Sequence, residues 1–122
     1  MSALCVRTWT CFFVTLIVFC VGVTPAVAGW TAEFVPTQIG TANYSGVVLI
    51  TPPVGHTYQN PNGCSYTDAY AIDATGFGAG GHKEQVSLAL GAFLNGKPIK
   101  LNIAGCSATP GWPLVISMQV LQ

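Results

Sequence analysis

The chain has 122 residues, of which 51% are hydrophobic and only 7% are charged, and its formal net charge is zero. This length fits one small domain with a thin core. The scarcity of basic residues argues against nucleic acid or an anionic membrane as a partner, because both need a positively charged face. The abundance of Val, Ile, Leu and aromatic residues argues against a disordered chain.

Residues 1–28 have the organisation of an export signal. Arg7 supplies positive charge, residues 11–23 form an apolar run, and Ala26-Val27-Ala28 provides an A-x-A cleavage site. The apolar run is shorter than the roughly 20 residues that a membrane span needs. We therefore expect a cleaved signal peptide and a single secreted or periplasmic domain over residues 29–122, with no membrane span.

Cys64 and Cys106 are the two cysteines that remain after the signal. Exported proteins meet an oxidising environment, so we predict a structural disulfide between them. A redox pair or a metal site is the weaker interpretation, because residues 29–122 contain no C-x-x-C spacing.

Three strands are predicted in the first half of the domain. They cover residues 30–38, 44–51 and 65–73. Pro36 weakens the first, because proline is confined to edges and bulges. The second contains the apolar run from Val47 to Ile50, which suggests burial on both faces. The third has Tyr66 and Tyr70 on the same side of an alternating pattern.

A helix is predicted over residues 83–95. Apolar residues recur there at helical spacing, namely Val86, Ala89, Leu90, Phe93 and Leu94. Asn95-Gly96 is a C-terminal stop signal, and the glycine-rich stretch from Gly76 to Gly81 is expected to be a flexible connection before the helix. Gly91 costs about 1 kcal/mol relative to alanine, which suggests that a neighbouring strand approaches the helix at this point.

Two further strands follow the helix. The first runs from Ile99 to Gly105-Cys106, where it ends, and it alternates apolar and polar residues. The second covers residues 114–121. Its apolar residues at alternate positions are expected to share one face, namely Leu114, Ile116, Met118 and Val120.

The order β-β-β-α-β-β predicts a mainly β domain. It is the order of an OB-like five-stranded barrel, in which the helix closes one end. An open α+β sheet with the same elements is the alternative. In either arrangement the core is expected to contain Val47, Leu49, Leu90, Phe93, Ile99, Leu101, Ile103, Ile116 and Met118.

No motif in the chain identifies an enzyme. The stretch from Gly76 to Gly81 matches G-x-G-x-x-G, but no acidic residue follows Glu84 to bind a ribose, so we expect no cofactor. There is no G-x-S-x-G either. Four side chains could form a metal site or an acid–base pair, but they lie in separate segments: His56, His82, Asp68 and Asp73. We predict no catalytic residue and no metal site.

Aromatic residues near strand ends and in loops suit ligand binding. Such rings stack on sugars and anchor protein partners. Trp112 and Tyr44 are candidates of this kind, with core filling as the alternative for Trp112. Asn43-Tyr44-Ser45 also fits the N-glycosylation pattern, which matters in a eukaryotic host.

Short motifs spread over most of residues 29–122 resemble a group of small secreted bacterial single-disulfide proteins, mostly of unassigned function. The motifs are Asn60-Pro61-Asn62-Gly63-Cys64, Leu94-Asn95-Gly96-Lys97-Pro98, Gly105-Cys106 and the strand over 113–120. More distantly, the element order and disulfide resemble the OB-fold binding subunits of A–B toxins of the subtilase and typhoid type. Those subunits form ring pentamers that bind sialylated glycans, so the resemblance implies glycan recognition by an oligomer.

In the toxin subunits a serine that follows a tyrosine near the second strand contacts the sugar. Tyr44-Ser45 is the stretch that looks alike here, so the resemblance implies a ligand site at these residues. The chain departs from the toxin pattern at Gly46, where the subunits carry an acid. Residues 29–122 also hold no arginine to meet the carboxylate of a sialic acid.

These observations favour a secreted, non-enzymatic binding module that recognises a glycan or a cell-surface partner, with self-association as a homo-oligomer left open. Tyr44, Ser45 and Trp112 are the predicted ligand-binding residues. The alternative is a periplasmic or extracellular inhibitor or accessory protein that acts by protein–protein contact. No nucleic acid is expected as a partner.

Overall fold

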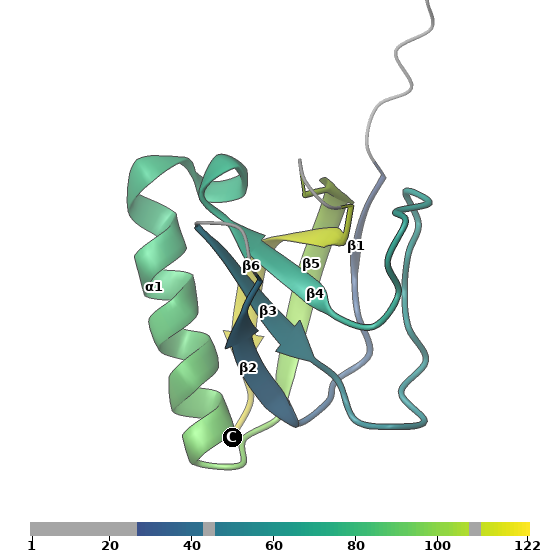
Figure 1. Cartoon of the computed structure of the whole chain (residues 1–122). Helices are drawn as coiled ribbons and strands as arrows, with labels where there is room; N and C mark the ends of the chain where they lie inside the picture. The colour runs from purple at the N-terminus through teal and green to yellow at the C-terminus, as the bar shows by residue number, and fades with distance from the viewer. Residues whose placement is uncertain (1–26, 43–45, 108–110) are drawn as a thin grey trace, which may run out of the picture.

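The structure is a computed structural model that describes residues 27–42, 46–107 and 111–122 (Figure 1). In this part of the chain one helix, α1, accompanies six strands. The elements in chain order are β1 (Ala28–Trp30), β2 (Gln38–Thr41), β3 (Val47–Thr51), β4 (Tyr70–Asp73), α1 (Ala74–Leu94), β5 (Ile99–Cys106) and β6 (Pro113–Val120).

The strands form one sheet in the order β1-β5-β6-β4-β3-β2. Neighbouring strands are antiparallel, except that β4 and β6 are parallel. The mainly β class is confirmed. The sheet is open, with β1 and β2 as its edges, so the open α+β sheet is the correct alternative and the OB-like five-stranded barrel is wrong.

The segment predicted as one strand over residues 30–38 is strand only at its two ends, because β1 ends at Trp30 and β2 begins at Gln38. Before Pro36, Phe34 forms a bridge to Ile99 and so stays on the β5 side of the sheet. After Pro36, the backbone N–H of Thr37 donates to the carbonyl of Thr51, on the β3 side. Proline has no N–H with which to continue a ladder. The chain therefore crosses from one edge to the other and supplies a strand to each.

Helix α1 begins at Ala74, earlier than the predicted start at residue 83. The glycine-rich stretch from Gly76 to Gly81 is helical and not a flexible connection. Asp73, directly before the helix, is a residue type favoured at the N-cap, and this signal was missed. No helix in the described part of the chain is long and apolar enough to span a membrane.

The sheet has a large core on one face and a small cluster on the other. On the large side, Ala89 and Ala92 of α1 pack with buried residues of the sheet such as Ile50 and Ile72. The opposite face of the same strands carries the second cluster, because side chains alternate along a strand. Its buried members are Val47, Ala69, Ala71 and Trp112. We call this second group the Trp112 cluster.

The helix is rotated relative to the predicted orientation. Leu90 and Phe93 were expected in the core, but they are 41% and 36% exposed, while Ala89 and Ala92 are buried. Apolar residues occur all round α1, so the sequence pattern did not determine its inner face. Gly91 is exposed and a Cβ there would meet nothing within 4 Å, so the predicted close approach of a strand is wrong.

Three core residues of β5 are buried as predicted, namely Ile99, Leu101 and Ile103. In β6, by contrast, the set of side chains that points into the core switches from odd to even positions partway along the strand. Asn102 pairs with Ser117 and Ile103 pairs with Val115, so Ile116 is an extra residue on β6. Such a bulge reverses which side chains face inward. As a result Val115 and Met118 are buried, whereas Ile116 is only half-buried.

We expect Val115→Ala to lower the free energy of unfolding by about 2 kcal/mol, because it removes two methyl groups from a fully buried site. Ile116→Ala should cost about 1 kcal/mol or less, although it removes more atoms. Chemical denaturation of both variants checks this order. A larger loss for Ile116→Ala would mean that β6 keeps a regular alternation without the bulge.

The predicted disulfide is present. Cys64 and Cys106 are joined with an S–S distance of 1.98 Å and a Cα–Cα distance of 5.6 Å, at a sequence separation of 42. The bond connects the end of β5 to a segment before β4 that has no strand pairing of its own.

Replacing both cysteines by serine should lower the free energy of unfolding by about 4 kcal/mol, because the unfolded chain regains the entropy of an open loop of this length. Urea denaturation of the double variant against the oxidised wild type measures the difference. Equal stabilities would show that the segment around Cys64 is held by its other contacts alone.

The start of the described chain takes part in the fold. The backbone N–H of Val27 donates to Asn62 Oδ1 at 2.7 Å, and Asn62 Nδ2 donates to the Val27 carbonyl at 2.8 Å. The signal peptide remains a prediction. Cleavage after Ala28 would remove these two hydrogen bonds and would leave Gly29 and Trp30 to form β1.

Candidate ligand-binding surface

An aromatic pair lies close to the disulfide. The rings of Tyr66 and Trp112 are stacked, with centroids 4.9 Å apart and planes inclined by 29°. Trp112 is 8% exposed and Tyr66 is 45% exposed. Because one face of the Tyr66 ring lies on Trp112, solvent reaches its outer face. We call Tyr66, Trp112 and the neighbouring Asp68 the Tyr66 site.

Hydrogen bonds fix Trp112 in position. Its indole Nε1–H donates to Asp68 Oδ1 at 2.8 Å. Its backbone N–H donates to Ser107 Oγ at 3.1 Å, and the N–H of Ser107 donates to the Trp112 carbonyl at 2.7 Å. With these bonds satisfied and its ring packed in the Trp112 cluster, the indole provides a rigid support for Tyr66.

The segment that carries Tyr66 is held at both ends. The backbone N–H of Tyr66 donates to the Gly111 carbonyl at 3.0 Å, and the disulfide anchors Cys64 two residues earlier. Before Cys64, the side chain of Asn60 closes a turn by bonding both the N–H and the carbonyl of Cys64, at 2.7 and 2.8 Å. Gly63 completes this turn with φ of 65°, a conformation that favours glycine.

The turn explains why the motif Asn60-Pro61-Asn62-Gly63-Cys64 precedes the site. Asparagine side chains bond to nearby backbone, and glycine supplies the left-handed position, so these residues direct the chain into the disulfide. Ser65, Thr67 and Asp68, around Tyr66, are all exposed. The segment therefore presents one aromatic face together with hydroxyl and carboxylate groups.

The structure places the predicted ligand-binding residues as follows. Trp112 is buried under Tyr66, so it supports the surface and Tyr66 forms it. Tyr44 and Ser45 lie outside the described residues. Ala42 and Val47, which flank them, pack in the Trp112 cluster. The ends of the segment that holds Tyr44 and Ser45 are thus attached to the same cluster as the Tyr66 site.

Tyr66 itself was missed as a surface residue because the alternation of Tyr66 with Tyr70 placed both on one strand. In the structure β4 begins only at Tyr70. The sequence signal was available in the run from Ser65 to Asp68, which is polar apart from Tyr66 and lies between the disulfide and the apolar strand. An isolated aromatic residue in such a polar run is typical of a surface contact.

A second aromatic group, buried in the core, fixes the loop after β3. Tyr70 is fully buried and stacks on Tyr58 with centroids 4.7 Å apart. Its hydroxyl accepts the backbone N–H of Gln59 at 3.1 Å and lies 3.2 Å from His56 Nε2. The hydroxyl of Tyr58 donates to the Ala69 carbonyl. Burial raises the pKa of both tyrosines, so both are protonated and neutral at physiological pH.

The contact between His56 and Tyr70 holds the loop after β3 against the buried Tyr70 ring. The Tyr70 oxygen accepts from Gln59, so its own proton is available to His56 Nε2 in the neutral tautomer that leaves this nitrogen unprotonated. Burial lowers the pKa of His56, which favours that neutral form. In the described ranges no group of three His, Cys, Asp or Glu residues is placed to hold a metal ion.

Stability should therefore depend on pH through His56. In the unfolded chain His56 titrates near its ordinary pKa of 6.5, whereas in the fold its pKa is lower. Between these values the unfolded state binds more protons, so stability is fully present above pH 6.5 and falls as the pH drops towards the lowered pKa.

Urea denaturation at a series of pH values on either side of 6.5 measures this step. His56→Gln should flatten the decrease, whereas the matched variant His82→Gln keeps the contact between His56 and Tyr70 and should retain it. A decrease of unchanged size in His56→Gln would assign the pH dependence to other groups.

Comparison of the chain with protein-family models, with curated proteins and with solved structures finds no match. Any function must therefore be inferred from the surfaces that the fold presents.

Proposed function

We propose that this protein is a secreted, non-enzymatic binding module that recognises a glycan or a partner at the cell surface, and that it acts as a homo-oligomer. The observation that supports this proposal is the Tyr66 ring, which is 45% exposed while its inner face rests on the buried Trp112. A solvent-facing ring held in this way is ready to bind without reorganising.

The chemistry of the Tyr66 site favours an uncharged sugar. The C–H face of a sugar ring stacks on an aromatic ring, and its hydroxyls donate to a carboxylate such as that of Asp68. Ser65 and Thr67 add exposed hydroxyls beside the ring. Asp68 carries negative charge and would repel an acidic sugar, so we propose a neutral glycan in preference to a sialylated one.

The resemblance to the binding subunits of A–B toxins points to the same class of ligand. In this proposal Tyr44 and Ser45 stay candidate contacts on sequence grounds. Tyr66, which the resemblance does not include, is the central residue. The Trp112 cluster contributes by holding the site rigid.

The proposal is tested by screening the purified protein on an array of neutral and sialylated glycans, then measuring the affinity of Tyr66→Ala for the best ligand. We expect a neutral glycan to bind and Tyr66→Ala to weaken binding at least tenfold, which corresponds to about 1.4 kcal/mol. Tyr66→Phe keeps the stacking ring and should retain most of the affinity.

Phe93→Ala is the matched control, because Phe93 is also a partly exposed aromatic residue but lies on α1, on the other side of the sheet. Equal losses in Tyr66→Ala and Phe93→Ala, or selective binding of sialylated glycans, would contradict the proposed site.

A further inference from the structure

The face of the sheet opposite α1, which we call the outer face, continues from the Trp112 cluster onto β6, β5 and β1 (Figure 1). Leu101 and Ile103 of β5 point into the large core, so Asn102 between them points to the outer face. Trp30 of β1 and Ser117 of β6 pair with Asn102 from its two sides and share this face. We call Trp30, Asn102 and Ser117 the Trp30 row.

The Trp30 row combines an aromatic ring with hydrogen-bonding groups. Trp30 is 44% exposed on the edge strand β1, and the amide of Asn102 and the hydroxyl of Ser117 follow it across the sheet. Next to the row, Lys100 pairs with Gln119 on the same face. A ring that covers the C–H face of a sugar, together with groups that bond its hydroxyls, is the combination that suits a glycan.

The hydrogen bonds of Asn102 are incomplete within the described part of the chain. Its Oδ1 atom is buried and has no hydrogen-bond partner among the described residues. A buried acceptor without a donor costs about 1–3 kcal/mol, so the fold alone does not explain an asparagine at this position. The side chain as a whole is only half-buried, and a half-turn of its amide can offer the oxygen to a donor that arrives on the face.

The Trp30 row and the Tyr66 site are two ends of the outer face. Asn102 pairs with Ser117 at one end, whereas Cys106 pairs with Pro113, next to Trp112, at the other. The stretch of β5 between these pairs spans about 13 Å, at about 3.3 Å per residue. Ala104 lies between them with only a methyl side chain, so the face stays low there. This spacing is too long for a single sugar and suits a short chain of sugars.

We propose that the outer face binds a chain of neutral sugars, with one unit stacked on Tyr66 and a later unit stacked on Trp30. The inference rests on the glycan recognition of the proposed function and extends it, because it makes the ligand an oligosaccharide and adds a second stacking residue. Every sugar hydroxyl both donates and accepts, which matches a row of amide and hydroxyl groups.

The charges of the outer face favour an uncharged chain. Lys100 is half-buried beside the Trp30 row, and Glu33 is exposed a few residues after Trp30. Asp68 is exposed at the Tyr66 end. Acidic and basic groups therefore alternate along the face, and neither sign prevails to attract an ionic ligand. The ammonium of Lys100 acts as a donor to sugar oxygens, as the carboxylate of Asp68 acts as an acceptor.

The dependence of affinity on chain length tests the inference. The probes are cello-, malto- and chito-oligosaccharides, each from the monosaccharide to the hexasaccharide, titrated calorimetrically into the secreted protein with its disulfide intact. For one of these series the affinity should rise roughly tenfold or more with length, because contact with the second ring is intramolecular once the first unit is bound.

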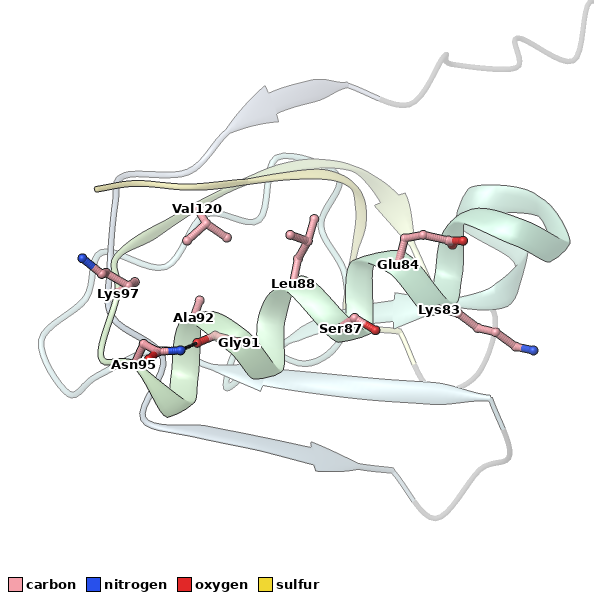
Figure 2. Close-up of a pocket in the computed structure, with 9 residues that line it drawn as sticks. All are labelled: Lys83, Glu84, Ser87, Leu88, Gly91, Ala92, Asn95, Lys97 and Val120. Atoms are coloured by element: carbon pink, nitrogen blue, oxygen red, sulfur yellow. Dashed lines mark hydrogen bonds between the residues drawn. The ribbon is translucent and has the colours of Figure 1, made fainter.

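Trp30→Ala should remove this gain and leave the affinity for the monosaccharide unchanged, which also shows that the variant is folded. Trp30→Phe keeps a stacking ring and should retain most of the gain. Leu88→Ala is the matched control, because Leu88 is exposed to a similar extent, at 45%, but lines the groove of about 750 Å³ beside α1 on the opposite side of the sheet (Figure 2). This control should bind every chain as the wild type does.

Equal affinities for short and long chains, no binding of any chain, or a gain that survives in Trp30→Ala overturns the inference. So does a larger loss in Lys100→Gln than in Trp30→Ala, since the row would then bind an acidic group. If chains of all lengths bind equally and only Tyr66→Ala weakens them, the proposed function is correct and the extended face is wrong. If long chains bind through Trp30 and Tyr66→Ala has no effect, the Tyr66 site is wrong.

Discussion

The disulfide between Cys64 and Cys106 ties a segment without strand pairing to the end of β5. Tyr66 follows within two residues, and its backbone bond to Gly111 then aligns the ring over Trp112. Trp112 in turn covers Ala69 and other members of the small cluster on the outer face of the sheet. The covalent bond thus determines both where the aromatic surface lies and how well that face of a thin sheet is covered.

Local alternation and turn chemistry were sufficient to predict part of the fold. The strand that begins at Ile99 was found because apolar and polar residues alternate strictly along it. The edges of the sheet could not be found in this way, because β1 and β2, which flank the segment around Pro36, are defined by their pairing with the distant strand β5 and with β3. Which side chains of β6 point into the core depends on the extra residue Ile116. That residue can be recognised as a bulge only from the pairing of β6 with β5.

The candidate site shows the same limit. Export and the count of cysteines predicted the disulfide, whereas Trp112, which was predicted as a ligand-binding residue with core filling as the alternative, is buried. Its burial could not be predicted, because that burial depends on Tyr66, on Asp68 and on a cluster contributed by three distant segments. For α1, a helix that is apolar on every side carries no pattern that separates its core face from an interface.

The excess apolar surface of α1 and the position of the Tyr66 site have a joint consequence. The helix packs on one face of the sheet, whereas Trp112 and Tyr66 lie on the other. If the homo-oligomer of the proposed function formed through the α1 side of the sheet, it would leave the Tyr66 sites uncovered. A single shallow aromatic surface binds a sugar weakly, but two sites on one rigid body turn the second binding step into an intramolecular one and raise the avidity by about 10²–10⁴. Pairing through the helix would therefore convert a weak site on a small domain into an effective receptor for a surface that displays many copies of one glycan.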